Sequence, residues 1–258
     1  MKINYIILSV LFVFSGVLRA NSFNLPVPVG TIKGAHVDYE DSDTVRIVVG
    51  YGECSGYYWE VTSVAMLDIT VTPGADDAVY FYIDHSASSY PSPSFYDSLT
   101  EPVWSDSAQG WYDGEDRCVG AILYENATSS LKHTRRIGDV YYFASQIVLD
   151  DNVNPDGTYN ATTKDVDDYA PVMTYAVEVE MYGQDGGDKM AARAHAVANP
   201  YSIAGISGYH KGQATGWLYT GSGDRSIEII GENDDENVMK CRMRGYRFER
   251  DAENDLEE

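Results

Sequence analysis

The sequence predicts an all-β protein made of two β-sandwich-like, jelly-roll-like units. Short apolar runs rich in Val, Ile, Tyr and Phe alternate with breaks rich in Gly, Pro, Asn and Ser, which is typical of strands joined by turns. No stretch after the first 20 residues keeps a helical period over a convincing length. In the last predicted strand, 237–247, basic and apolar side chains alternate with period two, which is the side-chain period of a strand.

The first 20 residues have the pattern of a secretory signal peptide. Lys2 supplies a positive start, an apolar stretch follows, and Ala20 offers a small residue for cleavage. The alternative is an uncleaved anchor, but the apolar run is short for a spanning helix of ~20 residues. We therefore expect an exported protein, extracellular, secreted or on a virion surface, with no membrane span after signal removal.

The first sandwich-like unit is expected over residues 21–150. Its predicted strands are 31–49, 59–72, 79–84, 118–124, 136–140 and 141–149. Within the first strand region, the alternation predicts five inward positions: Ile32, Val37, Val45, Ile47 and Val49. The most distinctive local feature is the pair Arg135 and Arg136, followed directly by Ile137 and Gly138.

The second unit is expected over residues 151–248, after a break that contains Pro155 and Gly157. Its predicted strands are 172–182, 189–198, 214–220 with 226–230, and 237–247. In the last of these, Lys240, Arg242 and Arg244 alternate with Cys241 and Met243, so one face is basic and the other apolar. An acidic tail, 249–258, ends the chain.

Residues 86–116 differ from the rest because prolines, serines and aromatic residues occur there without a helical or strand period. One interpretation is a loop that packs on the fold through its own rings. The other is a recognition loop, since Trp and Tyr present stacking faces with a polar edge. The candidate ligand-binding residues are Tyr90, Tyr96, Trp104, Trp111, Tyr112 and Asp113.

Three cysteines follow the predicted signal peptide. In an exported chain, a disulfide between Cys54 and Cys118 within the first unit is the natural pairing, which leaves Cys241 free. The alternative is three separate buried thiols, because spacing alone does not establish disulfide geometry.

Calcium is the one cofactor that the sequence leaves open. Asn152, Asn154 and Asp156 have the spacing of the first oxygen ligands of a calcium loop, and Gly157 follows. The twelfth position holds Thr163 instead of a bidentate Glu, so an Asx-rich turn is the competing interpretation. No serine stands in a nucleophile elbow and no Cys/His grouping suggests zinc, so we assign no catalytic residue and expect no enzyme.

Three segments resemble those of bacteriophage tail-fibre and related virion-appendage proteins. The segment HTRRIGDVYYFASQ is similar to an Arg-Arg-Ile-Gly-x-Val strand followed by a Phe and a Gln, here Phe143 and Gln146. Upstream, VYFYID at 79–84 resembles the aromatic strand that precedes it, and MRGYRF at 243–248 resembles a closing Gly-Tyr strand. The resemblance implies an appendage module that is commonly a homotrimer and that carries no catalytic residues.

The net charge of −22 repels nucleic acid, so a nucleic-acid partner is not expected. We expect an extracellular structural or adhesive protein that binds surface ligands through loops, with a cell-surface glycan or other virion or surface proteins as partners. The alternative is a secreted bacterial carbohydrate-binding module without viral connection, favoured by the signal peptide and the aromatic loop. A secreted glycoside hydrolase is a third class, but the chain offers no recognisable acid pair.

Overall fold

A computed structural model describes residues 29–150, 160–183, 189–194, 204–207, 212–220, 225–232 and 240–248. Within these ranges the fold is all-β, as predicted: every strand pair is antiparallel, and the helical structure is a single 3-10 turn, η1 (Asp167–Tyr169). The predicted signal peptide 1–20, the acidic tail 249–258 and the calcium candidates Asn152, Asn154 and Asp156 lie outside the described residues.

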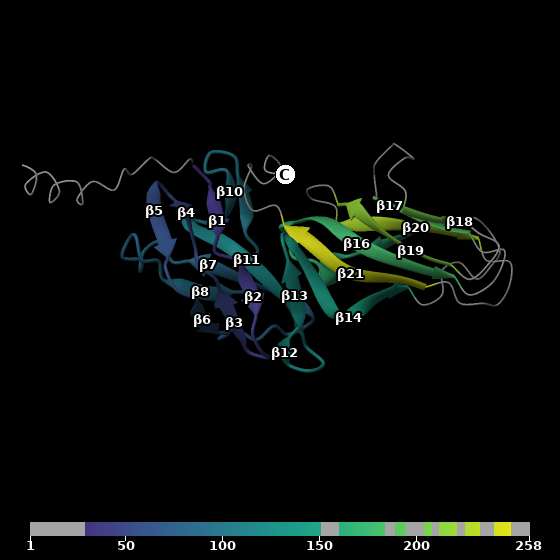
Figure 1. Ribbon diagram of the computed structural model, residues 1–258, viewed down its shortest axis with the longest axis horizontal. Helices are drawn as coiled ribbons and strands as arrows, with labels where there is room; N and C mark the ends of the chain where they lie inside the picture. Colours follow the sequence, from purple (N-terminus) through teal and green to yellow (C-terminus); the bar gives the residue numbers. More distant parts are fainter. Residues whose placement is uncertain are drawn as a thin grey trace, which may run out of the picture.

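Two small sheets are formed by the start of the described chain (Figure 1). One has the order β1 (Ile32–Gly34), β4 (Gly50–Cys54) and β5 (Tyr57–Val61). The other has the order β2 (Val37–Tyr39), β3 (Thr44–Ile47) and β6 (Ala65–Asp68). Four of the five predicted inward positions are buried, but Val49 is 53% exposed, because the single strand expected at 31–49 is three short strands joined by turns.

A six-stranded sheet follows, in which β7 (Asp77–Ile83) and β11 (Asp116–Glu125) are central. Its other strands are β8 (Phe95–Ser98), β9 (Val103–Ser105), β10 (Gly110–Asp113) and β12 (Ser130–Leu131). The expectation that 86–116 lacks strands is therefore wrong. The strands β8, β9 and β10 have only three or four residues each, which is too short for a period to stand out among the prolines and serines.

The remaining strands form two further sheets, at the right in Figure 1. The five-stranded sheet has the order β13 (Thr134–Ile137), β14 (Val140–Asp150), β21 (Lys240–Phe248), β16 (Thr174–Gly183) and β19 (Gly212–Tyr219). The four-stranded sheet has the order β15 (Asn160–Asp165), β20 (Ser226–Glu232), β17 (Lys189–Ala194) and β18 (Ala204–Ser207). Because β14 pairs with β21, the boundary predicted at Asp150 is crossed by one continuous sheet.

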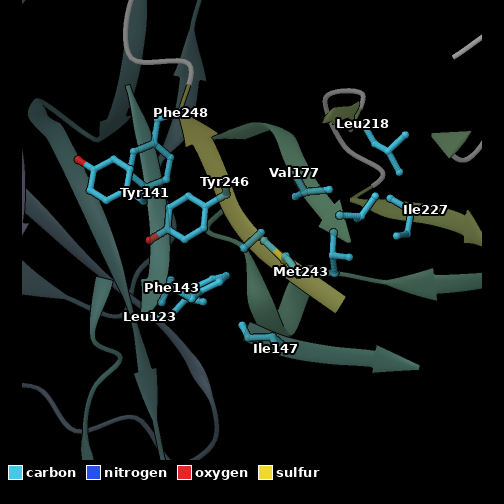
Figure 2. Close-up of a cluster of buried hydrophobic side chains, with 14 of the residues drawn as sticks. Leu123, Tyr141, Phe143, Ile147, Val177, Leu218, Ile227, Met243, Tyr246 and Phe248 are labelled. Carbon is cyan, nitrogen blue, oxygen red and sulfur yellow. The ribbon is translucent and has the colours of Figure 1, made fainter. Parts of the chain in front are cut away.

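The six-stranded sheet contributes to two apolar clusters, one from each of its faces. The N-terminal core combines it with the two small sheets and includes Ile32, Val37, Ile47, Trp59, Val79, Phe81, Ile83, Val119 and Ile122. The shared core combines it with the five- and four-stranded sheets and includes Tyr80 and Tyr82 of β7. Figure 2 labels others of its members, among them Leu123, Tyr141, Phe143, Val177, Ile227, Met243, Tyr246 and Phe248. Successive residues of β7 alternate between these clusters, as the pleat requires.

A register shift between Cys118 and Gly120 of β11 changes which residues face each cluster. Cys118 faces the shared core before the shift, and the odd-numbered Ala121 and Leu123 face it afterwards. A Cβ on Gly120 would lie 2.8 Å from a methyl carbon of Val37, so only glycine lets β2 approach this closely.

In the shared core, aromatic rings from β14 and β21 stack on one another. The rings of Tyr141 and Tyr246 are 5.4 Å apart and nearly parallel, and Phe248 lies 4.9 Å from Tyr141 (Figure 2). Burial of such rings is the largest apolar contribution that single side chains make to stability. The part of the chain that the structure describes contains no helix with the length and apolar character needed to span a bilayer.

Candidate ligand-binding groove

A groove of about 980 Å³ opens on the five-stranded sheet, on the face opposite the shared core. The segment 133–146, which carries the Arg-Arg-Ile-Gly feature, supplies most of its lining through β13 and β14. Arg242 and Arg244 of β21 and Glu178 of β16 complete it. These two arginines are on the basic face predicted for the last strand, and Cys241 and Met243 are in the core, so that prediction is confirmed.

Two irregularities of the β ladder hollow this face. Arg244 is an extra residue on β21, because Glu178 pairs with Gly245 while Val179 pairs with Met243. On β14 the pairing with β21 shifts between Tyr142 and Ile147, which leaves Ala144 and Ser145 exposed at the rim. Such bulges redirect side chains. Arg242 and Arg244 share the outward face by the strand period, and after the bulge the even-numbered Tyr246 and Phe248 face the shared core.

One row of paired residues crosses the groove from strand to strand. Arg135 pairs with Tyr142, Tyr142 with Gly245, Gly245 with Glu178, and Glu178 with Trp217. Residues directly opposite in antiparallel strands share a face. Gly245 is buried, and a Cβ there would clash with the Tyr141 carbonyl oxygen, so β14 and β21 approach closely between the side chains of Tyr142 and Glu178. The row thus presents the guanidinium of Arg135, the phenol ring of Tyr142 and the carboxylate of Glu178.

A network of polar side chains connects the strands of the groove. The Gln146 amide donates to Glu180 Oε2 at 2.9 Å, and Arg242 Nη1 donates to Gln146 Oε1 at 3.1 Å. Arg244 is more loosely held: its Nη1 is 3.6 Å from Glu180 Oε2 and its Nε is 3.9 Å from Glu178 Oε2. Both distances exceed the 2.7–3.2 Å of an N–H···O hydrogen bond, so the donors of Arg244 are not consumed by these ion pairs.

Two buried polar atoms of the groove residues make no hydrogen bond within the described part of the chain: Arg242 Nε and Glu178 Oε2. Burial raises the pKa of Glu178 above its ordinary value; attraction to Arg244 opposes this shift, and repulsion from Glu180 adds to it. A buried polar atom without a partner costs roughly 1–3 kcal/mol. Both atoms are buried, so the arrangement around them costs stability rather than offering open hydrogen-bonding positions.

The two neighbouring arginines of β13 have opposite roles. Arg136 faces inward, where its Nε donates to Asp38 Oδ1 of β2 at 3.0 Å and its Nη1 to the Gly138 carbonyl. Arg135 faces the groove, is exposed, and has no ion-pair or hydrogen-bond partner among the described residues. The period of a strand explains the split, since successive side chains point to opposite faces.

The aromatic residues predicted to bind a ligand do not form one site. Tyr112 is 5% exposed in the N-terminal core, so its assignment as a ligand-binding residue is wrong. Its neighbour Trp111 packs against the shared core, because adjacent residues of β10 point to opposite faces. Tyr96 also packs there, stacking on Tyr82 and donating to Asp116 at 2.9 Å.

The other three candidates are partly exposed. Trp104 meets the edge of Trp111 at 5.6 Å, and its Nε1 donates to Asp106 Oδ1 at 3.0 Å. Tyr90 packs against the N-terminal core and stacks on Tyr57 at 5.0 Å. Asp113, which ends β10, is half-buried. The structure therefore brings Trp104 and Trp111 together and sets Tyr90 apart from both.

Sequence reasoning missed a group of exposed tyrosines on the hairpin β4–β5. This group, called the tyrosine platform, consists of Tyr51, Tyr57 and Tyr58, which are 41%, 52% and 40% exposed. Tyr51 and Tyr58 lie 6.3 Å apart, and Tyr57 stacks on Tyr90. Glu60 accepts a hydrogen bond from the Tyr58 hydroxyl at 3.3 Å. The sequence shows Tyr57 and Tyr58 directly after Gly56, but the period of a strand does not indicate that both side chains remain exposed.

The predicted disulfide between Cys54 and Cys118 is wrong, since all three cysteines are buried free thiols. Cys54 lies in the N-terminal core and Cys118 in the shared core, so the six-stranded sheet stands between them. Cys54 Sγ donates to the Glu115 carbonyl at 3.5 Å, while Cys118 Sγ lies 3.4 Å from Met173 Sδ. Burial raises the pKa of the Cys54 thiol, which keeps it protonated.

Within the ranges that the structure describes, no three His, Cys, Asp or Glu side chains gather in a way that could hold a metal ion. The comparisons with known proteins give no family for the chain: no protein-family model matches it, and a search of curated proteins finds no match. The groove's own residues are thus the basis for inferring what the protein does.

Proposed function

We propose that this chain is an extracellular adhesive β protein that binds a cell-surface glycan in the groove of the five-stranded sheet. The observation that carries the proposal is the groove itself, built by the 133–146 segment and the last strand. Two of the three segments that resemble virion appendages, 133–146 and 243–248, thus pair with each other at this place. The third, 79–84, is most of the central strand β7.

The proposal includes a sandwich-like construction. The N-terminal core receives residues from the two small sheets and from one face of the six-stranded sheet, which is the arrangement of side chains expected between two packed layers. The shared core receives residues from the other face of that sheet and from the five- and four-stranded sheets. Packing of this kind leaves the outward face of the five-stranded sheet to bind a ligand.

The second candidate is a secreted carbohydrate-binding module without viral connection, and the tyrosine platform favours it. Sugar rings stack on exposed phenol rings, and carboxylates accept hydrogen bonds from hydroxyl groups. Tyr51, Tyr58 and Glu60 offer both features on one face of the β4–β5 hairpin. In this version the platform binds a neutral sugar and the groove has no role.

A glycan microarray probed with the fluorescently labelled full chain separates the two candidates. The groove variant is Arg135→Ala with Tyr142→Ala, and the platform variant is Tyr51→Ala with Tyr58→Ala. The proposal expects the groove variant to lose binding at unchanged melting temperature, while the platform variant binds like wild type. Loss in the platform variant alone supports the carbohydrate-binding module, and a wild-type chain that binds no glycan contradicts both. Mass spectrometry of purified virus particles then decides whether the protein is part of a virion.

A further inference from the structure

The charge of the groove is opposite to that of the protein as a whole. The chain carries a net charge of −22, yet the groove is lined by three arginines and one glutamate, with a second glutamate, the buried Glu180, hydrogen-bonded to Gln146 of the lining. Two arginines outside the groove are closely matched by acids: Arg46 Nε lies 3.0 Å from Glu40, and Arg225 Nε lies 2.5 Å from Asp167. A local surplus of guanidinium groups in an acidic protein indicates a site for an anion.

The arginines of the groove also keep donors available. Arg135 is exposed and has no partner among the described residues, and the Nη1 and Nε atoms of Arg244 lie 3.6 Å and 3.9 Å from its two glutamates. A guanidinium group presents its N–H donors in a planar fork that matches the two oxygens of a carboxylate. The groove therefore holds unused donors of the geometry that a carboxylate requires.

The rest of the lining fits a sugar that carries this carboxylate. Glu178 lines the groove, and its carboxylate is an acceptor for a sugar hydroxyl. Ser145 and Gln146 also line the groove, and the ring of Tyr142 lies in the same row as Glu178. The same Glu178 repels a doubly charged phosphate more strongly than a singly charged carboxylate. A flexible acidic peptide would in addition pay the entropy of ordering its backbone.

We infer that the groove takes an acidic saccharide, a sugar that carries a carboxylate, and that Arg135 and Arg244 receive that carboxylate; this inference rests on the proposed function. The saccharide hydroxyl groups then meet Glu178 and Gln146 in the lining of the same groove. The remainder of the protein is acidic and would repel an anionic sugar at long range. At physiological salt the Debye length is about 8 Å, so this distant negative charge is screened and the arginines of the groove dominate at short range.

The test is isothermal titration calorimetry of the full chain at physiological salt with three acidic probes: tetragalacturonate, a hyaluronan tetrasaccharide and sialyllactose. Each probe is paired with its methyl ester, which has the same shape without the charge. The inference expects at least one acid to bind and its ester to bind roughly ten- to a hundredfold more weakly, the effect of losing a charge-assisted hydrogen-bond pair. Arg135→Ala and Arg244→Ala should weaken binding of the acid over a similar range. Arg46→Ala, which removes the same charge outside the groove, should leave it unchanged.

Several outcomes overturn the inference. Equal affinity for acid and ester, or unchanged affinity in Arg135→Ala and Arg244→Ala, removes the carboxylate from recognition while leaving a glycan adhesin in place. Tighter binding of tetraglutamate, inorganic phosphate or galactose 6-sulfate than of every acidic sugar assigns the groove to another anion. Failure of all three acids to bind also contradicts the inference, and the microarray then decides separately whether the proposed function stands.

Discussion

The six-stranded and the five-stranded sheet share one core but differ in what their second faces do. The residues 78–83 of β7 are all buried, because its two faces serve the shared core and the N-terminal core. In β21, buried residues alternate with half-buried ones, because one face serves the shared core and the other faces the groove. Figure 2 shows Met243, Tyr246 and Phe248 of β21 on the core side. The polar side chains that can bind a ligand therefore gather on the sheet with an open face.

The strongest test of this comparison removes a ring from the sheet that is buried on both faces. Phe81→Ala should lower the free energy of unfolding by about 3–5 kcal/mol, since the ring is fully buried and its loss leaves a cavity in the N-terminal core. Urea denaturation followed by circular dichroism measures it. Tyr142→Ala on the groove face is the matched control, with a change of less than ~1 kcal/mol. Equal losses in the two variants would contradict the distinction between the sheets.

Trp104 and Trp111, which pair across the hairpin β9–β10, allow the same comparison of a core-facing with a more open side chain. Trp111 packs against the shared core, whereas Trp104 is in edge contact with Trp111 and donates a hydrogen bond to the Asp106 carboxylate. We expect Trp111→Ala to cost about 1.5–3 kcal/mol, the value of burying a large apolar side chain, and Trp104→Ala less. Thermal unfolding of both variants checks this order. Should Trp104→Ala lose more stability than Trp111→Ala, the assignment of Trp111 to the core is wrong.

The neighbouring arginines of β13 give a smaller effect with a clear sign. Arg136→Ala removes a charge-assisted hydrogen bond to the half-buried Asp38, so it should lower the free energy of unfolding by about 1–2 kcal/mol. Arg135→Ala should stay within ~0.5 kcal/mol of wild type, since its side chain is exposed on the groove. Chemical denaturation of the two variants measures the difference. A reversed order would mean that Arg135, rather than Arg136, anchors the strand.

The smallest expected effect concerns Glu178 and pH. Burial is the main cause of its raised pKa; repulsion from Glu180 raises the pKa further, while attraction to Arg244 and Arg247 lowers it. The folded state therefore takes up a proton at higher pH than the unfolded state, whose pKa is near 4.5. As pH falls from above the raised pKa towards 4.5, wild type should gain stability relative to Glu178→Gln. Melting temperatures of both proteins from pH 7 downwards measure this difference, and a relative loss by wild type contradicts the raised pKa.

Local pattern was sufficient for much of the fold. The all-β class, the apolar strand around Phe81 and the basic and apolar faces of the last strand follow from side-chain period alone, because a strand points successive residues to opposite faces whatever it pairs with. The strands β15 and β18 were not predicted, since the first lies in a segment rich in Asn, Asp and Thr and the second has only four residues.

The groove depended on pairing between distant parts of the chain, which no local period encodes. The distinctive pair Arg135 and Arg136 was visible in the sequence, but only the pairing of β14 with β21 brings Arg135 into one row with Glu178. The bulge at Arg244 and Gly245 is likewise a property of two strands in register, not of one. The cysteines illustrate the same limit: composition indicated export and a bridge, whereas the fold placed Cys54 and Cys118 in different cores.

By itself, the sequence determined that this chain is built of strands and, in the longer strands away from bulges, which residues share a face, because both depend on neighbours a few positions apart. Only the tertiary structure decided which faces became core and which stayed open. That choice depends on which sheets pack against each other, and therefore on contacts between residues as far apart as Tyr142 and Gly245. The candidate site belongs to this second category: its residues were visible from the start, and their meeting was not.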